Sequence, residues 1–328
     1  MNPILVACLR VLAGLGLMLL NGVVLIYMLR KVLGHLHVRL GPMNVGWHGT
    51  VQTVADVLKL LTKEDPTPRA VDKALYFLAP AVVFIPSLAA YAALPFSKTW
   101  AMADLATGLL FTFGIMSLVP LGILMAGWSS ANKWSLLGGM RAVGQQIAYE
   151  VPLLLSALPV VLMVGSLNLN DIVAAQDKLW FFIPQFPALL LFVVASLVEL
   201  NQTPFDMSEA ESELVAGFSS EYASMKFGLL FLSEFSNLFI MAGLTVTLFF
   251  GGWSLPFIPA QIQAGFAPIV FVAKTYLVIF FFMWIRGTFP RVRVDQLQQL
   301  GWKVLLPANL AWLLVTGVAV KLVEAVAR

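Results

Sequence analysis

The chain has 328 residues, of which 60% are hydrophobic and only 11% are charged, and its net charge at pH 7 is +3. Its mean hydropathy of +0.89 excludes an ordinary soluble domain. The single cysteine, Cys8, excludes an internal disulfide, and it excludes an iron–sulfur cluster held by this chain alone, because such a cluster needs about four ligands. No sustained alternation of polar and apolar residues indicates the strands of a membrane barrel. We therefore expect an all-α polytopic membrane protein.

Apolar runs recur along the chain, and each is long enough to cross a hydrocarbon core of about 30 Å as a helix. The first run has no basic segment before it and no small-residue cleavage site, so we take it as a retained span. The runs leave no room for a soluble catalytic domain. We expect a single integral membrane domain, 1–328, with about eight spans, at roughly 4–28, 74–96, 104–127, 139–163, 180–199, 226–250, 266–285 and 303–325.

Basic residues are concentrated in the first, third and seventh loops between these spans. By the positive-inside rule the odd-numbered loops are cytoplasmic and both termini face outward. The bias accounts for the net positive charge, so we expect no nucleic-acid partner. The three histidines, His35, His37 and His48, all lie in the first loop, which excludes paired haem ligands on facing helices.

The first loop contains a predicted amphipathic helix over residues 50–63. Gln52, Asp56, Lys59 and Lys63 form its polar stripe. Its apolar stripe follows helical spacing and comprises Val51, Val54, Ala55, Leu58 and Leu61. Such a helix lies at the membrane interface. It is either a connector that rests on the lipid headgroups or the rim of a lipid-accessible opening, and the glycine-rich stretch 39–49 before it predicts a shaped loop.

The fifth loop is unusually acidic for so apolar a chain. No lysine or arginine occurs in 199–225, whereas the carboxylates are Glu199, Asp206, Glu209, Glu211, Glu213 and Glu221. Pro204 is expected to end the preceding helix, and Ser208 with Glu211 forms a predicted capping box for a short helix. Like charges on one face of that helix repel. The loop is therefore either a solvated face or a surface whose charge changes or finds its partners in neighbouring proteins of a complex.

Glu150, Glu234 and Lys274 fall inside expected spans. One charge at a helix centre costs roughly 2.5–3.5 kcal/mol, so these side chains are expected to face the bundle interior. One interpretation is a Glu–Lys pair that holds helices together. The other is a proton or ion relay, in which Glu150 and Glu234 serve as successive acceptors if they face one cavity.

Four blocks of sequence carry a family resemblance: 39-RLGPMNVGWHGTVQTVADVLKLLTKED-65, 127-GWSSANKWSLLGGMRAVGQQIAYEVPL-153, 199-ELNQTPFDMSEAESELVAGFSSEYASMKF-227 and 286-RGTFPRVRVDQLQQLGWKVLLP-307. In these blocks the chain resembles the family of H-type membrane subunits of bacterial NADH:quinone oxidoreductase, respiratory complex I. The mitochondrial counterpart of that family is NADH dehydrogenase subunit 1. The resemblance covers essentially the whole chain in order.

The resemblance implies a membrane subunit with eight spans that joins a redox arm to a proton-pumping arm in the bacterial inner membrane. It implies a translocase subunit that helps to form a quinone chamber, with quinone as substrate and no redox cofactor or metal on this chain. FMN and iron–sulfur clusters are then expected on partner subunits. The implied partners are the hydrophilic quinone-site subunits, small membrane-arm subunits and the lipid bilayer.

The resemblance also implies roles for individual residues. The implied proton-coupling carboxylates are Glu150, Glu199, Asp206, Glu209, Glu211, Glu213, Glu221 and Glu234. The implied quinone-chamber residues are Arg39, Asp56, Lys59, Phe205, Phe218, Arg286, Arg291 and Arg293.

The chain departs from the family pattern at two places near the expected quinone entrance. Leu29 stands where the family usually has an acid, and Met43-Asn44 stands where it usually has Asn-Arg. The electron donor therefore stays open, and a subunit of a ferredoxin- or hydrogenase-linked complex is an alternative. A stand-alone ion/proton antiporter is a further alternative, although an antiporter does not need the acidic loop.

Overall fold

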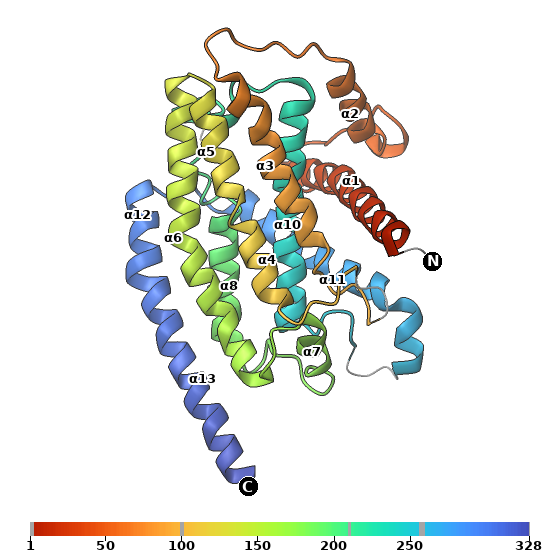
Figure 1. Cartoon of the computed structure of the whole chain (residues 1–328), viewed down its shortest axis with the longest axis vertical. Coiled ribbons are helices and arrows are strands. Elements are labelled where there is room, and N and C mark those ends of the chain that lie inside the picture. Colours follow the sequence, from red (N-terminus) through yellow and green to blue (C-terminus); the bar gives the residue numbers. More distant parts are fainter. Residues whose placement is uncertain (1–2, 99–101, 209–210, 256–259, 328) are drawn as a thin grey trace.

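The computed structural model describes residues 3–98, 102–208, 211–255 and 260–327, and all regular structure within these ranges is helical. Long helices pack side by side into a bundle (Figure 1). The long elements are α1 (Pro3–Leu36), α3 (Lys73–Tyr91), α4 (Gly108–Met116), α5 (Val119–Ser129), α6 (Lys133–Val164), α8 (Phe186–Glu199), α10 (Ser224–Phe249), α11 (Ala260–Thr288) and α13 (Leu306–Ala327). The short ones are η1 (Trp47–Gly49), α2 (Gln52–Thr62), α7 (Leu169–Ala174), α9 (Glu211–Leu214), η2 (Gly217–Ser219), α12 (Val294–Gln299) and a π-helical stretch at Leu300–Leu305.

Seven helical segments in the described residues are long and apolar enough to cross a membrane, and α8 is a shorter apolar helix. The prediction of an all-helical polytopic membrane protein is thereby confirmed; seven of the about eight expected spans have a long apolar helix in the described residues, and the fifth has the shorter α8. The expected span 104–127 consists of two helices, α4 and α5. The ring of Pro120 would clash with the carbonyl oxygen of Met116 in one continuous helix, so the helix is interrupted here.

The fifth expected span, 180–199, is corrected by the structure. Residues 181–185 form turns, and α8 begins only at Phe186, with Pro187 in its first turn, where a missing backbone N–H costs nothing. The 14 residues of α8 rise about 21 Å, which is less than the hydrocarbon thickness of about 30 Å.

The loops alternate between the two ends of the bundle. At one end Val292 N donates to Pro204 O over 3.0 Å, and Ser224 Oγ donates to Leu60 O over 2.9 Å, which brings together the first, fifth and seventh loops. At the other end Leu109 N donates to Leu167 O over 3.1 Å and Phe182 N donates to Phe249 O over 2.9 Å, which joins even-numbered loops. This alternation is what successive spans require.

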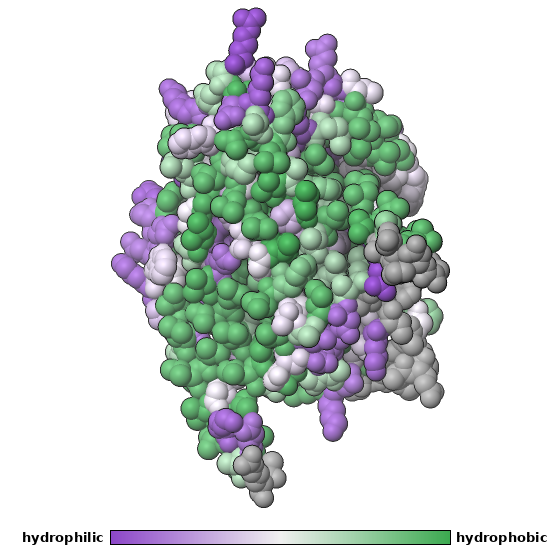
Figure 2. Space-filling model, in the orientation of Figure 1, coloured by the Kyte–Doolittle hydropathy of each residue, from purple (hydrophilic) through white to green (hydrophobic). Residues whose placement is uncertain are grey.

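Helix α10 lies at the centre of the bundle and α13 at its edge (Figure 1). In Ser224–Phe249, 78% of the apolar 18-residue stretch is buried inside the protein, whereas in Val294–Val326 the buried share is 17%. Apolar residues cover most of the visible face of the molecule (Figure 2). The expected interfacial helix is also present as α2, and Val51, Val54, Leu58 and Leu61 of its apolar stripe are exposed, as they are in a helix that rests on lipid.

Candidate functional site

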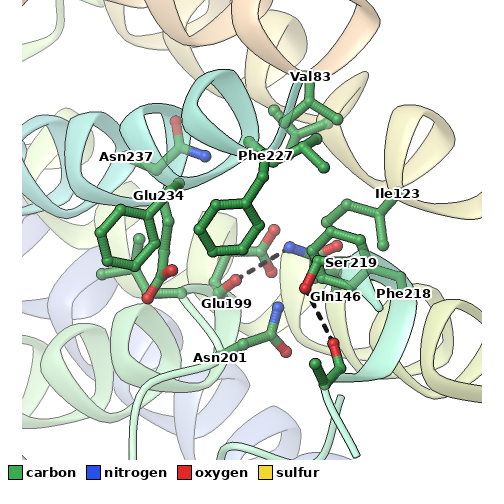
Figure 3. A pocket seen from close by; sticks show the side chains of 15 residues that line it. Val83, Ile123, Gln146, Glu199, Asn201, Phe218, Ser219, Phe227, Glu234 and Asn237 are labelled. Carbon is green, nitrogen blue, oxygen red and sulfur yellow. Dashed lines mark hydrogen bonds between the residues drawn. The ribbon is translucent and has the colours of Figure 1, made fainter. Parts of the chain in front are cut away.

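A cavity of about 220 Å³ lies between the middle of the bundle and the acidic loop (Figure 3). Helix α10 contributes one face of its surface, because Phe227, Phe231 and Glu234 recur at helical spacing. Glu199 is the last residue of α8, so the end of that short helix delivers its carboxylate to the cavity wall. The other polar and aromatic lining residues are Gln146, Asn201, Phe218, Ser219 and Asn237.

Four buried oxygen atoms of this lining have no hydrogen-bond partner among the described residues: Glu199 Oε2, Gln146 Oε1, Asn201 Oδ1 and Asn237 Oδ1. The Glu199 residue is only 9% exposed. Gln146 Nε2 donates to the Glu199 backbone oxygen over 3.2 Å, which leaves Gln146 Oε1 free to accept (Figure 3). Buried acceptors without donors are costly, and the cavity is many times larger than the roughly 10–15 Å³ that a single water needs. The cavity thus has the polarity and the size to be hydrated.

Glu234 also belongs to a second contact, with Gln202 and Arg286. Gln202 Nε2 donates to Glu234 Oε1 over 3.0 Å, and Arg286 Nη1 donates to Gln202 Oε1 over 2.6 Å. Arg286 Nη1 itself lies 3.9 Å from Glu234 Oε1. A buried amide therefore stands between the carboxylate and the guanidinium.

Three carboxylates of the acidic loop have partners within this chain, so for these three the alternative of partners only in neighbouring proteins of a complex does not hold. Asp206 pairs with Arg291 at 3.1 Å, and Glu213 with Arg141 at 2.6 Å. Glu221 accepts a 2.7 Å hydrogen bond from Asn132. Each contact links the loop to an element that is distant in sequence and lies at the same end of the bundle. Glu209, the side chain of Glu211 and the predicted capping box lie outside the described residues.

Glu150 is half-buried on α6, one turn beyond Gln146. It lies near enough to Glu199 for the two like charges to interact, but it is not among the residues that line the cavity. The carboxylate that shares the cavity with Glu234 is Glu199.

Lys274 on α11 donates hydrogen bonds to backbone oxygens in the segment that follows α10. Its ammonium donates to the carbonyl oxygens of Phe250, Gly252 and Ser254 over 2.6–2.9 Å and lies 4.5 Å from the ring centre of Trp180. No described carboxylate lies within ion-pair distance of it. The hypothesis of a Glu–Lys pair is therefore wrong for this residue.

The residues implied for the quinone chamber lie in more than one place. Arg286 and Arg291 contact Gln202 and Asp206, which flank Phe205 in the sequence, whereas Asp56 and Lys59 lie on α2. Arg39 and Arg293 are exposed, Phe205 is buried, and Phe218 is the member of the set that lines the cavity. On α2, Asp56 forms an ion pair with Arg30 at 2.5 Å, and Lys59 lies 3.9 Å from it. Burial works to raise the pKa of Asp56, but hydrogen bonds from Arg30 and Gln52 and the charges of Arg30 and Lys59 lower it overall. Asp56 thus holds α2 against the end of α1.

The two departures from the family pattern have local explanations. Leu29, in place of an acid, packs against the hydrophobic core. Met43 Sδ accepts a 3.1 Å contact from Lys31 Nζ, so the thioether occupies the space beside the end of α1. Both replacements are accommodated by contacts within this chain.

Comparison with other proteins identifies the family of this chain. The family model described as NADH dehydrogenase matches residues 9–317. The chain belongs to this family. The NADH dehydrogenase relatives include a protein of Anoxybacillus flavithermus, which is 50% identical over 298 residues, 89% of this chain and 87% of the relative. A protein of Paramagnetospirillum magneticum is 45% identical over 96% of this chain and 92% of its own length, and one of Geobacillus kaustophilus is 48% identical over 93% and 92%.

All three relatives are named as the H-type subunit of NADH-quinone oxidoreductase, so the resemblance drawn from the four sequence blocks is confirmed. The expected multi-pass membrane location agrees with the seven long apolar helices in the described residues. The same residues contain no group of three or more His, Cys, Asp or Glu side chains arranged to hold a metal ion.

Sequence reasoning missed the amides of this NADH dehydrogenase family member. Asn201, Gln202 and Asn237 line the cavity or connect its charges, yet amides give no charge signal in a sequence. The available signal was their position in the sequence: Asn201-Gln202 begins two residues after Glu199, the carboxylate at the end of an apolar helix, and Asn237 lies one turn beyond Glu234.

Proposed function

We propose that this chain is the H-type membrane subunit of a proton-translocating NADH:quinone oxidoreductase in the bacterial inner membrane. Its family membership and the names of its relatives support this assignment. The chain contributes to the quinone chamber beside the hydrophilic quinone-site subunits, and it couples quinone reduction to proton translocation. FMN and the iron–sulfur clusters belong to partner subunits, and small membrane-arm subunits complete the path.

The observation that carries the coupling role is the cavity shared by Glu199 and Glu234. Glu199 lies 13 residues above the start of α8, and Glu234 lies 15 residues above the end of α10, so both stand about 20 Å from the outer end of the bundle. Water in the cavity connects the two carboxylates, and the unpartnered oxygens hold it. Glu150, close to Glu199 on α6, receives or returns the same proton. The described loop carboxylates Asp206, Glu213 and Glu221 then lie between this level and the cytoplasm, with the odd-numbered loops on the cytoplasmic side.

The quinone enters on the side of α2. The exposed apolar stripe of this helix and the end of α1 frame an opening at the headgroup level, and the isoprenoid tail lies against them. Arg39 and Arg293 are exposed on the same cytoplasmic side, where partner subunits bring the quinone headgroup. A tail-labelled quinone photoprobe is expected to label the region from the end of α1 to about residue 60, and labelling restricted to the even-numbered loops would contradict the entrance.

The decisive experiment replaces each cavity carboxylate by its amide. Glu199→Gln and Glu234→Gln keep size and polarity but cannot carry a proton, so each is expected to leave the complex assembled and to lower proton pumping at least several-fold. Glu150→Gln is expected to act in the same direction. Glu211→Gln is expected to do less, because an amide still closes a capping box.

The matched control is Glu324→Gln, since Glu324 is exposed and pairs with its neighbour Lys321 at the other end of the bundle. Proton uptake and quinone reductase turnover are measured in membrane vesicles and normalised to assembled complex. Full pumping by both cavity variants would remove Glu199 and Glu234 from the path.

A further inference from the structure

Gln202 occupies a position that the coupling role leaves unexplained. It is only 4% exposed, and it follows α8 by three residues. Its amide contacts Glu234 of α10 on one side and Arg286 of α11 on the other. Nε2 also lies 3.4 Å from the backbone oxygen of Leu200, which anchors the amide to its own segment.

The orientation of this amide is fixed by chemistry. A guanidinium only donates hydrogen bonds, so the amide oxygen of Gln202 must face Arg286. The amide nitrogen is then turned toward Glu234, as the 3.0 Å contact shows. Rotation of the amide by half a turn would place two donors against each other at Arg286. Gln202 therefore always presents a donor to Glu234.

A fixed donor distinguishes the two forms of a carboxyl group. The anion accepts from it in a charge-assisted hydrogen bond, which is roughly twice as strong as a neutral one. The protonated acid either accepts weakly through its carbonyl oxygen or turns its own hydrogen away. A change of charge on Glu234 thus changes the strength of the Glu234–Gln202 bond, and the shared amide passes the change to Arg286.

We propose that Gln202 is a positioning residue that sets the proton affinity of Glu234 and transmits its charge state to Arg286 through a polarity-fixed amide bridge. The proposal rests on the proposed coupling function. The 3.9 Å between Arg286 and Glu234 is part of the arrangement, because a direct contact would hold the anion more tightly. The other charged group that acts on Glu234 is Asp206, which is itself paired with Arg291, while Glu199 faces it across the cavity.

The test compares Gln202→Met with Gln202→Glu in the purified complex. Met keeps the length of the side chain and removes both hydrogen bonds. Glu still accepts from Arg286 but no longer donates to Glu234, so it cuts one arm of the bridge. The readout is the infrared band of the protonated Glu234 carboxyl group, identified by its loss in Glu234→Gln.

In both variants the band is expected to appear at higher pH than in the native complex, by about one pH unit for Met and by more for Glu. The control Gln299→Met changes an exposed glutamine and is expected to leave the band unchanged. An unshifted band in an assembled Met or Glu variant would overturn the bridge, because a purely structural side chain alters assembly and not titration. If Glu234→Gln retains full pumping, the coupling function fails instead, while a shifted band still supports the bridge.

Discussion

Lys226 and Asp65 form an ion pair, with 2.9 Å between Nζ and Oδ2, that joins the first turn of α10 to the segment after α2. The Lys226 ammonium also lies 4.8 Å from the ring centre of Tyr76 and 4.0 Å from that of Phe77. Ser224 Oγ donates to the backbone oxygens of Leu60 and Lys63 in the same place. The interfacial helix is thus attached directly to the helix that carries Glu234.

Lys226→Met is expected to release this attachment. The variant loses the ion pair and the cation–π contacts, which together stabilise the join by about 1–2 kcal/mol. Tryptic cleavage at Arg69 and hydrogen exchange in residues 60–72 should increase in the assembled complex. Lys303→Met, at an exposed lysine, is the control. Equal hydrogen exchange in the two variants would show that the Lys226–Asp65 pair does not attach the segment after α2 to α10.

Gly138→Ala is expected to disturb the cavity from outside it. A Cβ on Gly138 would lie 2.7 Å from Gly217 Cα and 2.9 Å from Phe218 N, both backbone atoms, so the η2 segment must move. We expect a loss of about 1–3 kcal/mol in thermal unfolding and lower quinone reductase turnover. Gly144→Ala, on the same helix with nothing within 4 Å, should be neutral or slightly stabilising. Equal behaviour of the two variants would contradict close packing of η2 on α6.

The attachment of α2 to α1 is expected to depend on pH in one direction. The folded structure lowers the pKa of Asp56, so its stabilising contribution is complete above the ordinary carboxyl value of 3.8 and is lost as the pH falls through the depressed value. Asp56→Asn should show at pH 7 the loosening that the native chain shows only in acid. Hydrogen exchange of residues 52–62 measures it, and native-like protection in Asp56→Asn would contradict the tether.

Lys274→Met is expected to act on stability and not on pumping per complex. The change leaves the carbonyl oxygens of Phe250, Gly252 and Ser254 without their shared donor, at a cost of about 1–3 kcal/mol. The thermal midpoint of the complex should fall, whereas proton uptake normalised to assembled protein should stay native. Lys178→Met, at an exposed lysine, is the control. A selective loss of pumping would assign Lys274 to the proton path.

The spans and the interfacial helix were predictable because hydropathy and helical periodicity are local properties. The start of α8 was missed because residues 180–185 are as apolar as a span, although Pro184 and Pro187 interrupt it and the Gln185 side chain is occupied by a 2.7 Å hydrogen bond from Trp312. The partners of the acidic loop were not predictable at all. Arg141 and Glu213 are 72 residues apart, and Asn132 and Glu221 are 89 apart, so only the tertiary packing brings them together.

The shortness of α8 has an electrical consequence. The hydrogen bond from Phe182 to Phe249 ties the turns just before α8 to the end of α10, so the roughly 9 Å missing from the length of α8 lies on the side of the acidic loop. On the proposed coupling path, a proton that reaches Glu199 through that loop crosses about a third of the hydrocarbon thickness, and moving one charge across the whole thickness costs about 2.3 kcal/mol per 100 mV. A third of that, about 0.8 kcal/mol, changes the occupancy of Glu199 by about fourfold for each 100 mV. In the proposed coupling role, the protonation of Glu199 therefore depends on the membrane voltage as well as on the pH of the aqueous phase.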